Sequence, residues 1–274
     1  MTDQADPCSS CQETCPSKEH NFQVPQGPLN DVKHVIAVMS GKGGVGKSSI
    51  TGLLAASFAR EGYKVGILDA DITGPSIPKI FGLRERATSS EHGLFPVKSK
   101  KLGIPIMSIN LLVEREEDQV IWRGPIIAGV VKQFWQDVVW GELDYLFVDL
   151  PPGTGDAPLT VMQSLPLDGI VVVSSPQDLA VMVVKKAVNM AELLEIPILG
   201  LVENMSYAVC PHCHERFELF GSSQGQAVAD SVHIPLLASL PLDPALAALC
   251  DEGRIEEYAP QGTNVVESIA ARVK

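Results

Sequence analysis

The chain has 274 residues and a formal net charge of −12, from 33 Asp and Glu against 21 Lys and Arg. This length suits one large α/β domain with a single core, and the acidic balance without a basic block excludes duplex nucleic acid as an expected partner. The sequence has no leader-like N-terminus and no long apolar run, so we expect a cytoplasmic protein that does not contact a membrane.

Residues 1–30 differ from the rest in composition, and we expect a flexible tail there, followed by one domain over residues 31–274. The tail is rich in Asp, Gln, Ser and Pro and has too few large apolar residues to fold alone. It carries Cys8, Cys11 and Cys15. Their close spacing favours ligation of a metal or of a second iron-sulfur cluster, and incidental thiols are the alternative.

A glycine-rich loop, SGKGGVGKSS at residues 40–49, lies between an apolar run and a helical pattern. Its spacing satisfies G-x-x-x-x-G-K-[ST], in which backbone N–H groups and a helix N-terminus surround phosphates. Lys47 can reach the β and γ oxygens, and the Ser48 hydroxyl can ligate Mg²⁺. Lys42 is a second lysine that this motif does not require. A turn that matches by chance is the alternative. The expected nucleotide ligands in the loop are Gly41, Lys42, Gly43, Gly44, Val45, Gly46, Lys47, Ser48 and Ser49.

From residue 31 onwards, apolar runs alternate with helical patterns. This order predicts an α/β fold, a mostly parallel sheet with helices on both faces. Residues 82–123 interrupt this alternation. Short apolar stretches at residues 94–98 and 104–109 predict a small additional β segment, a β excursion, at the edge of the sheet. The expected strands cover residues 35–39, 65–68, 145–148, 169–173, 198–202 and 236–240, and the expected helices cover residues 50–60, 157–165, 180–194 and 224–232.

Three aspartates follow predicted strands. Asp149 ends the run YLFV and has the form of a Walker B aspartate, which holds Mg²⁺ directly or through water. Asp69 and Asp71 lie in GILDADITGPS, where strand alternation would point both carboxylates at the metal and the γ-phosphate. One of them could orient the attacking water. Each aspartate alone could instead cap the next helix. The absence of an N-K-x-D guanine motif favours ATP over GTP.

Cys210 and Cys213 form a C-x-x-C pair in an insert at about residues 205–220. A zinc ion or a cubane cluster normally takes four protein ligands, so one chain supplies half of a site. A two-fold axis beside the insert would join the pairs of two subunits, and we therefore expect a homodimer. A structural zinc knuckle and a redox dithiol are the alternatives. Zinc could also occupy these thiols in aerobic preparations. Cys250 is expected in the core.

The motifs GKGGVGKS, LDADITGPS, VDLPPGTGD, VENMS and C-P-x-C followed by FG together resemble the Mrp/NBP-type iron-sulfur cluster carrier ATPases. This family is a branch of the deviant Walker A, MinD/ParA-like P-loop NTPases. The resemblance covers roughly residues 31–262. It implies a homodimeric, Mg²⁺-dependent ATPase that assembles a [4Fe-4S] cluster and transfers it to apo iron-sulfur proteins.

The resemblance also assigns roles to single residues. It implies that Lys42 reaches the nucleotide of the partner subunit and that Asn204 recognises adenine. Cys210 and Cys213 match the pair that bridges the cluster between subunits. The family usually has glycine at the position of His214, and its members with a tail cluster use four cysteines where this tail has three. The expected catalytic residues are Lys42, Lys47, Asp69, Asp71 and Asp149, and the expected Mg²⁺ ligands are Ser48 and Asp149.

Three other classes of protein remain open at this point. A MinD/ParA-like spatial organiser, with a structural zinc at the C-x-x-C, would need a membrane-binding tail or a basic surface; the C-terminal TNVVESIAARVK is only weakly amphipathic. A nitrogenase-reductase-like electron donor would have its cluster cysteines far apart in sequence. A zinc-stabilised scaffold would leave the loop and the aspartates unexplained.

Overall fold

A computed structural model of the chain describes residues 24–72, 74, 76–112, 124–176, 180–259 and 264–273. The strands in this part of the chain are β1 (Asp31–Ser40), β2 (Val65–Asp69), β3 (Thr88–Ser90), β4 (Gly93–Phe95), β5 (Val97–Lys98), β6 (Pro105–Ser108), β7 (Glu142–Asp149), β8 (Gly169–Ser174), β9 (Ile198–Glu203), β10 (Ala208–Val209), β11 (Arg216–Phe217) and β12 (Leu236–Ser239). The helices are α1 (Lys47–Arg60), α2 (Ile77–Ile80), α3 (Gly124–Gln136), α4 (Asp156–Ser164), α5 (Ala180–Leu193), α6 (Gly225–Ser231), α7 (Pro244–Asp251) and α8 (Val265–Ala270), with short 3-10 turns at Ile109–Leu111 and Ile255–Glu257.

Eight strands form one central sheet in the order β12-β9-β8-β1-β7-β2-β6-β5. Neighbouring strands pair in parallel, except that β5 pairs with β6 in the antiparallel sense. The six strands predicted from apolar runs are all present in this sheet, and β5 and β6 confirm the β excursion at its edge. The α/β fold class is therefore confirmed.

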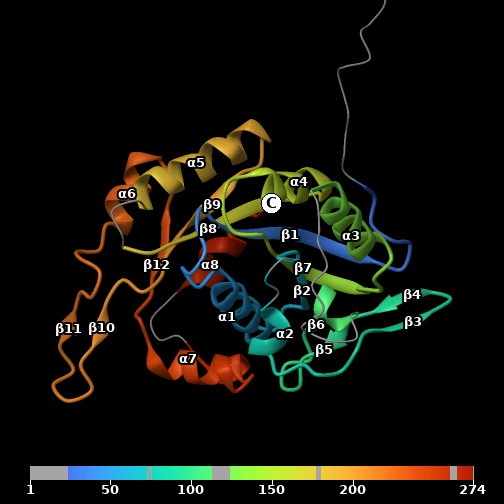
Figure 1. Ribbon diagram of the computed structural model, residues 1–274, viewed down its shortest axis with the longest axis horizontal. Coiled ribbons are helices and arrows are strands. Elements are labelled where there is room, and N and C mark those ends of the chain that lie inside the picture. Colours follow the sequence, from blue (N-terminus) through green and yellow to red (C-terminus); the bar gives the residue numbers. More distant parts are fainter. Residues whose placement is uncertain are drawn as a thin grey trace, which may run out of the picture.

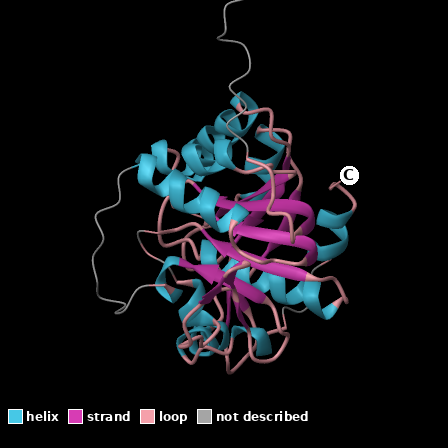
Figure 2. Ribbon diagram, turned by 90° about the vertical axis from the view of Figure 1, so that its right-hand side faces the viewer, coloured by secondary structure: helices cyan, strands magenta, loops and turns pink. Residues whose placement is uncertain are grey.

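Helices cover both faces of the sheet (Figures 1 and 2). One core cluster contains buried side chains of α3, α4, α5 and α6, and the other contains those of α1, α2 and α8. The alternation along β1 explains this division, because Val35 and Ala37 point into the first cluster and Ile36 and Val38 into the second. A strand buried on both faces must be apolar at successive positions, as the sequence of β1 is.

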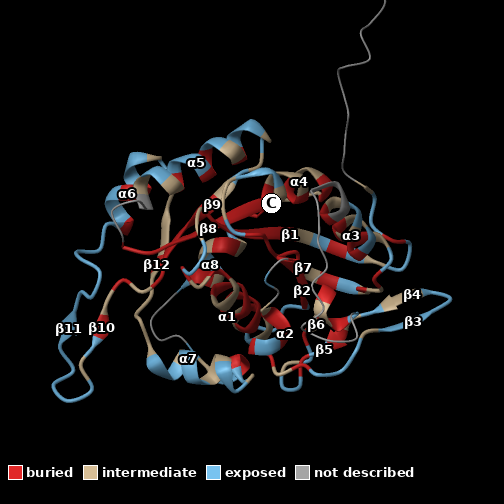
Figure 3. Cartoon of the chain, in the orientation of Figure 1, coloured by how far each residue is buried: buried red, intermediate tan, exposed pale blue. Residues whose placement is uncertain are grey.

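Several elements were not predicted from the sequence, among them α3 and the hairpin of β3 and β4. The helix α3 was not predicted, because its Ile- and Val-rich stretch IIAGVV has no decisive period and suits a strand as well as a helix. The hairpin of β3 and β4 extends beyond the predicted excursion and is largely exposed (Figure 3).

Residues 24–30 contact the domain, although the sequence assigns them to the tail. The Trp135 indole N–H donates to the Val24 carbonyl oxygen at 2.9 Å. The Asn30 side chain accepts from the Trp140 backbone N–H at 2.8 Å and donates to the Val138 carbonyl oxygen at 2.8 Å. The division of the chain at residue 30 stays a prediction. Within the described residues, every helix is too short or too polar to cross a bilayer.

The packing of α1 against the sheet gives a stability prediction. Phe58 is fully buried, and its ring packs edge-on against Tyr145 and Phe147, with centroid distances of 4.7 and 5.2 Å. Replacing Phe58 with alanine should lower the free energy of unfolding by about 3–5 kcal/mol, because a large cavity opens under the helix. Urea denaturation measures this change. The half-exposed Phe95 is the control, and Phe95→Ala should cost less than about 1 kcal/mol; equal losses in the two variants would contradict the packing argument.

Candidate functional site

The candidate site lies at the carboxyl edge of the sheet, where four neighbouring strands end in polar residues. β1 ends at Ser40, β7 at Asp149, β2 at Asp69 and β6 at Ser108. In the parallel register Asp69 is opposite Asp149 on one side and Ser108 on the other. Ligands in open α/β sheets bind at this edge, so the strand register itself gathers these polar groups where a ligand would lie.

The loop at residues 40–46 connects β1 to the N-terminus of α1. Gly46 caps the helix with φ of 81°, a left-handed conformation that favours glycine. A Cβ atom at Gly46 would also lie 2.4 Å from the side-chain nitrogen of Asn204. A Cβ atom at Gly41 would lie 1.7 Å from a methyl carbon of Val183 in α5. These two glycines therefore allow the close approach of the loop to β9 and α5.

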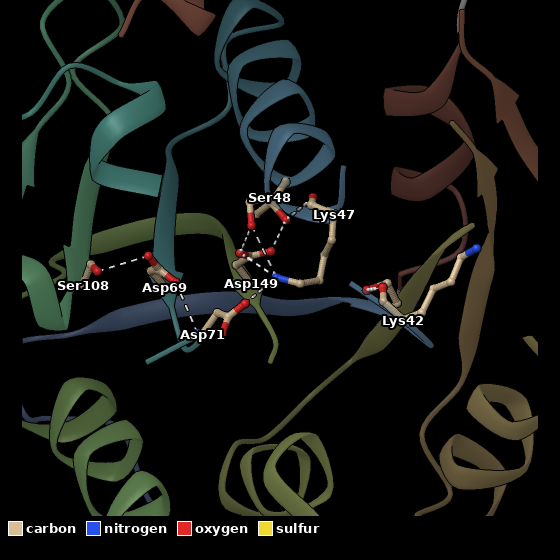
Figure 4. A network of polar contacts seen from close by, with 9 residues as sticks. Lys42, Lys47, Ser48, Asp69, Asp71, Ser108 and Asp149 are labelled. Atoms are coloured by element: carbon tan, nitrogen blue, oxygen red, sulfur yellow. Dashed lines mark hydrogen bonds and ion pairs between the residues drawn. The ribbon is translucent and has the colours of Figure 1, made fainter. Parts of the chain in front are cut away.

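Lys47 is the cation at the centre of this edge and is only 6% exposed. Its ammonium lies 2.8 Å from a carboxylate oxygen of Asp149 and 3.6 Å from one of Asp71. The Ser48 hydroxyl donates to Asp149 Oδ2 at 2.5 Å, and the Thr51 hydroxyl donates to Asp149 Oδ1 at 2.7 Å (Figure 4). Both oxygens of the buried Asp149 carboxylate are therefore bonded to the first five residues of α1.

Asp69 and Asp71 face different partners. Asp71 pairs with Lys47, whereas Asp69 bonds the Ser108 hydroxyl at 3.0 Å and accepts the Asp71 backbone N–H at 3.2 Å. We expected both carboxylates to point the same way. The difference arises because β2 ends at Asp69, so strand alternation does not extend to Asp71.

Burial raises the pKa of Asp69 well above its usual range, and the nearby Asp149 carboxylate adds to this effect. The positive charge of Lys47 and the bond to Ser108 oppose the rise in the pKa but are smaller. Asp69 therefore keeps its proton at pH values where an exposed aspartate is ionised.

The oxygen donors at this edge fit a magnesium ion. Mg²⁺ prefers hard oxygen ligands, usually one or two from the protein with the remainder from phosphates and water. The Ser48 hydroxyl and the Asp149 carboxylate are already in contact and come from the helix start and a strand end. They are the two residues that the sequence predicts as Mg²⁺ ligands, and this role stays a prediction.

Lys42 and Asn204 lie on the other side of the loop from the aspartates. The Lys42 side chain extends away from Lys47 (Figure 4). The Asn204 amide is buried and donates to the Val45 carbonyl oxygen at 2.9 Å. Asn204 is thus adjacent to the predicted phosphate loop, and its predicted contact with adenine stays a prediction.

Cys210 and Cys213 lie at the tip of the hairpin formed by β10 and β11, which projects from the sheet (Figure 1). Cys210 is half-buried, Cys213 is exposed, and both are free thiols. The Cys210 N–H donates to the Glu215 carbonyl oxygen and the His214 N–H to the Cys210 carbonyl oxygen, each at 2.9 Å. These bonds close a tight turn that places both sulfur atoms on one small loop.

The turn requires a left-handed residue at position 214. His214 has φ of 60°, a conformation that favours glycine, and this explains why glycine suits the position in the resembling family. Hydrogen bonds from the backbone N–H groups of Cys213 and then of His212 lower the pKa of the Cys210 thiol. The thiolate is the metal-binding form of cysteine, so this turn favours ligation.

The other cysteines are separate from the hairpin. Cys8, Cys11 and Cys15 lie outside the described residues, and their ligand role stays a prediction. Cys250 in α7 is half-buried rather than fully in the core, and its thiol donates to the Ser49 hydroxyl at 3.9 Å. Burial raises the pKa of this thiol. Among the described residues, no group of three or more His, Cys, Asp and Glu side chains is arranged to hold a metal ion.

Sequence analysis missed two residues of the network, Thr51 and Ser108. Thr51 also lies 3.0 Å from the Lys47 carbonyl oxygen, four residues back along α1. A polar residue within the apolar helix sequence ITGLLAASFAR was the signal that could have identified it. Ser108 carries no comparable signal, because only the pairing of β2 with β6 brings it to Asp69.

Comparisons with solved structures support both the fold and the relationship. A nucleotide-binding protein from Archaeoglobus fulgidus, solved in complex with ADP, is 50% identical with a TM-score of 0.76, over 84% of this chain and 90% of that one. The septum site-determining protein MinD from Pyrococcus horikoshii, complexed with Mg-ADP, has a TM-score of 0.58 over 89% of this chain and 95% of that one. At 17% identity the second likeness shows the fold alone.

Sequence comparisons place the chain in one family. An iron-sulfur cluster carrier protein of Clostridium perfringens is 47% identical, over 84% of each chain. A cytosolic Fe-S cluster assembly factor Nubp2 homolog of Anopheles gambiae is 44% identical, over 82% of this chain and 89% of that one. Residues 31–274 match the family described as ParA: NUBPL iron-transfer P-loop NTPase. The chain therefore belongs to the NUBPL-type iron-transfer P-loop NTPases, within the ParA/MinD-like group that its motifs resemble.

Proposed function

We propose that this protein hydrolyses ATP and carries a [4Fe-4S] cluster, which it assembles between two copies of the chain and transfers to apo iron-sulfur proteins. The observation that carries the proposal is the pair of free thiols Cys210 and Cys213, which lie together at a hairpin tip in a chain that also has the complete phosphate loop. Relatives named as iron-sulfur cluster carriers support the same function.

The nucleotide chemistry is assigned to the carboxyl edge of the sheet. The loop N–H groups and the N-terminus of α1 bind the phosphates, and Lys47 exchanges its carboxylate partners for phosphate oxygens. Ser48 and Asp149 hold Mg²⁺, which when bound neutralises the charge that develops on the phosphates. Asp71 lies close to Lys47 and is the residue best placed to orient the attacking water. Asp69, whose pKa is raised by burial, fixes the start of the loop after β2 by accepting a hydrogen bond from the Asp71 backbone N–H.

The cluster is the cargo, and Cys210 and Cys213 hold it as thiolates. Four thiolates complete the usual ligand set of a cubane cluster, so two chains must contribute a pair each. Transfer is an exchange of ligands, in which thiolates of the recipient replace those of the carrier. A cluster held at an exposed hairpin tip is accessible to such an exchange.

Several large apolar side chains near the cysteines are exposed. Val209, Phe217, Leu219 and Phe220 are each between 43% and 49% exposed and lie within seven residues of Cys210 or Cys213. Val209 is opposite Arg216 and Phe217 is opposite Ala208, so Val209 and Phe217 lie on different faces of the hairpin. A second copy of the chain that brings its cysteine pair to this hairpin would cover part of this apolar area, and such burial favours the dimer. The cytosolic assembly factors among the relatives support a cytoplasmic location.

Loss of the cysteine pair tests the cluster assignment. In a chain that carries Cys8→Ser, Cys11→Ser and Cys15→Ser, the further change of Cys210 and Cys213 to serine should lower the iron and sulfide bound after anaerobic reconstitution by about tenfold or more. The absorption spectrum and transfer to an apoprotein give the readout. Cys250→Ser is the matched control and should keep the cluster. Equal cluster content in the pair variant and the control would refute the bridging role.

The two lysines of the loop should behave differently in ATP turnover. Lys47→Ala should lower the ATP hydrolysis rate by about a hundredfold, because it removes the charge that faces the phosphates. Lys42→Ala should retain nucleotide binding but lose turnover, because we expect Lys42 of each subunit to contact the nucleotide bound to the partner subunit. Mixing the two variants should restore one working site per mixed dimer. If the mixture stays inactive while it forms dimers, Lys42 acts within its own subunit.

The raised pKa of Asp69 predicts a change of stability with pH. The folded state keeps the Asp69 proton after the unfolded chain has lost it, so ionisation above about pH 4 destabilises the wild type as the pH rises. Asp69→Asn cannot ionise, and its amide can still bond Ser108. Its free energy of unfolding should therefore increase relative to wild type between about pH 4 and pH 7. Urea denaturation across this range measures the difference, and a constant difference would show that Asp69 is ionised throughout.

A further inference from the structure

The hairpin that carries the cysteines is joined to the domain at two nearby points. We define the cysteine insert as residues 206–223, between the end of β9 and the start of α6. Most of its side chains are exposed, and it projects beyond the sheet edge (Figures 1 and 3). An element with so little buried area depends on its attachment points for its orientation.

A single carboxylate binds both ends of the insert. Glu203, the last residue of β9, is 2% exposed. It accepts from the Ser206 hydroxyl at 2.8 Å, where the chain leaves the sheet. It also accepts from the Ser223 hydroxyl and from the Gln224 backbone N–H at 3.1 Å, where the chain returns. The position of Glu203 therefore sets the separation of the two ends.

The carboxylate of Glu203 has little room to move. A Cβ atom at Gly225, the first residue of α6, would lie 2.9 Å from the carboxyl carbon of Glu203. The helix backbone thus packs directly on the acid group. Main-chain bonds also fix the strand end, since the Leu240 N–H donates to the Glu203 carbonyl oxygen and the Ser206 N–H to the Leu240 carbonyl oxygen.

The next residue along the chain contacts the phosphate loop. The Asn204 amide donates to the Val45 carbonyl oxygen at 2.9 Å, and its nitrogen lies 2.4 Å from the position that a Cβ atom of Gly46 would take. Its backbone N–H donates to the Ser174 carbonyl oxygen at 2.8 Å. Glu203 and Asn204 are both buried and adjacent, so one peptide bond separates the anchor of the insert from a contact with the loop.

We propose that Glu203 is a positioning residue that transmits the state of the phosphate loop to Cys210 and Cys213, through Asn204 and the two ends of the insert. This inference rests on the proposed function, since it concerns the coupling of the nucleotide to the cysteine pair. A nucleotide that repositions Val45 and Gly46 moves the Asn204 amide and with it the end of β9. The two hydroxyls on Glu203 then carry the displacement to both strands of the hairpin.

Glu203→Gln tests the transmission without a change in side-chain volume. Glutamine replaces one of the two acceptor oxygens with an N–H₂ donor, so it cannot accept both from the two hydroxyls that bond Oε2 and from the Gln224 N–H that bonds Oε1. Hydrogen exchange of the full chain, measured by mass spectrometry with and without Mg²⁺ and adenylyl imidodiphosphate, follows the loop and the insert separately. This readout needs no cluster, so its result does not depend on the cargo assignment.

In the wild type, the nucleotide analogue should protect loop amides and change the exchange rate of insert amides by about fivefold or more, the lower range of coupling between two sites. In Glu203→Gln the loop should still be protected, while the insert no longer responds. Ser223→Ala removes one of the two hydroxyls and should weaken the response, which keeps the test valid if the glutamine variant does not fold.

Glu256 provides a matched control. It is also buried and accepts three hydrogen bonds, from the Ser99 hydroxyl at 2.6 Å and from the N–H groups of Lys101 and Leu102 at 3.1 and 3.0 Å. Glu256→Gln should leave the response of the insert unchanged. The proposal is overturned if the wild-type insert does not respond while the loop is protected, or if Glu203→Gln responds as Glu256→Gln does. Either result leaves the cluster-binding experiment on Cys210 and Cys213 to be judged by itself.

Discussion

The buried Lys47 ammonium is the interaction on which the rest of the site depends. It lies among the carboxylates of Asp149 and Asp71, in a region from which water is largely excluded. Buried acids at neighbouring strand ends repel one another, so they need a cation at a fixed place. The left-handed Gly46 provides this place, because it starts α1 immediately beside the end of β7. A phosphate group that enters the loop therefore competes with carboxylates for the same ammonium.

Residues that belong to a local pattern can be identified from the sequence, whereas residues that strand order brings together cannot. The loop, Asp149 and the cysteine pair are local patterns, and the buried strands are continuous apolar runs. Thr51 and Ser108 became visible only in three dimensions, because Thr51 meets Asp149 across 98 residues of sequence. The helix α3 was missed for a different reason: β-branched residues within it obscure the helical period, and its packing against α4 decides its structure.

The phosphate edge is more buried than the cysteine turn, and this difference suits the function that we propose for each. The phosphate edge is enclosed, which strengthens its electrostatic interactions and raises the pKa of Asp69. The cysteine turn is exposed, so backbone N–H groups rather than a buried cation lower the pKa of Cys210. Under the proposed function, a recipient must reach the cluster at the cysteine turn, whereas burial at the phosphate edge limits the access of bulk water to the nucleotide. One chain provides both environments because the hairpin extends the second centre away from the sheet.

The end of β9 connects the buried phosphate edge to the exposed cysteine turn over a very short length of chain. Glu203 is the last residue of β9 and Asn204 is the first residue after it, and their side chains contact different neighbours: the ends of the cysteine insert and the Val45 carbonyl oxygen. Coupling over a long path of side chains requires every contact to have two arrangements, and each loose contact weakens it. Here a displacement passes through one peptide unit whose hydrogen bonds to Ser174 and Leu240 hold it within the sheet. The strength of the coupling then depends on how much the contacts of Val45 and Gly46 differ between the states with and without bound nucleotide. The position of the hairpin follows from that difference.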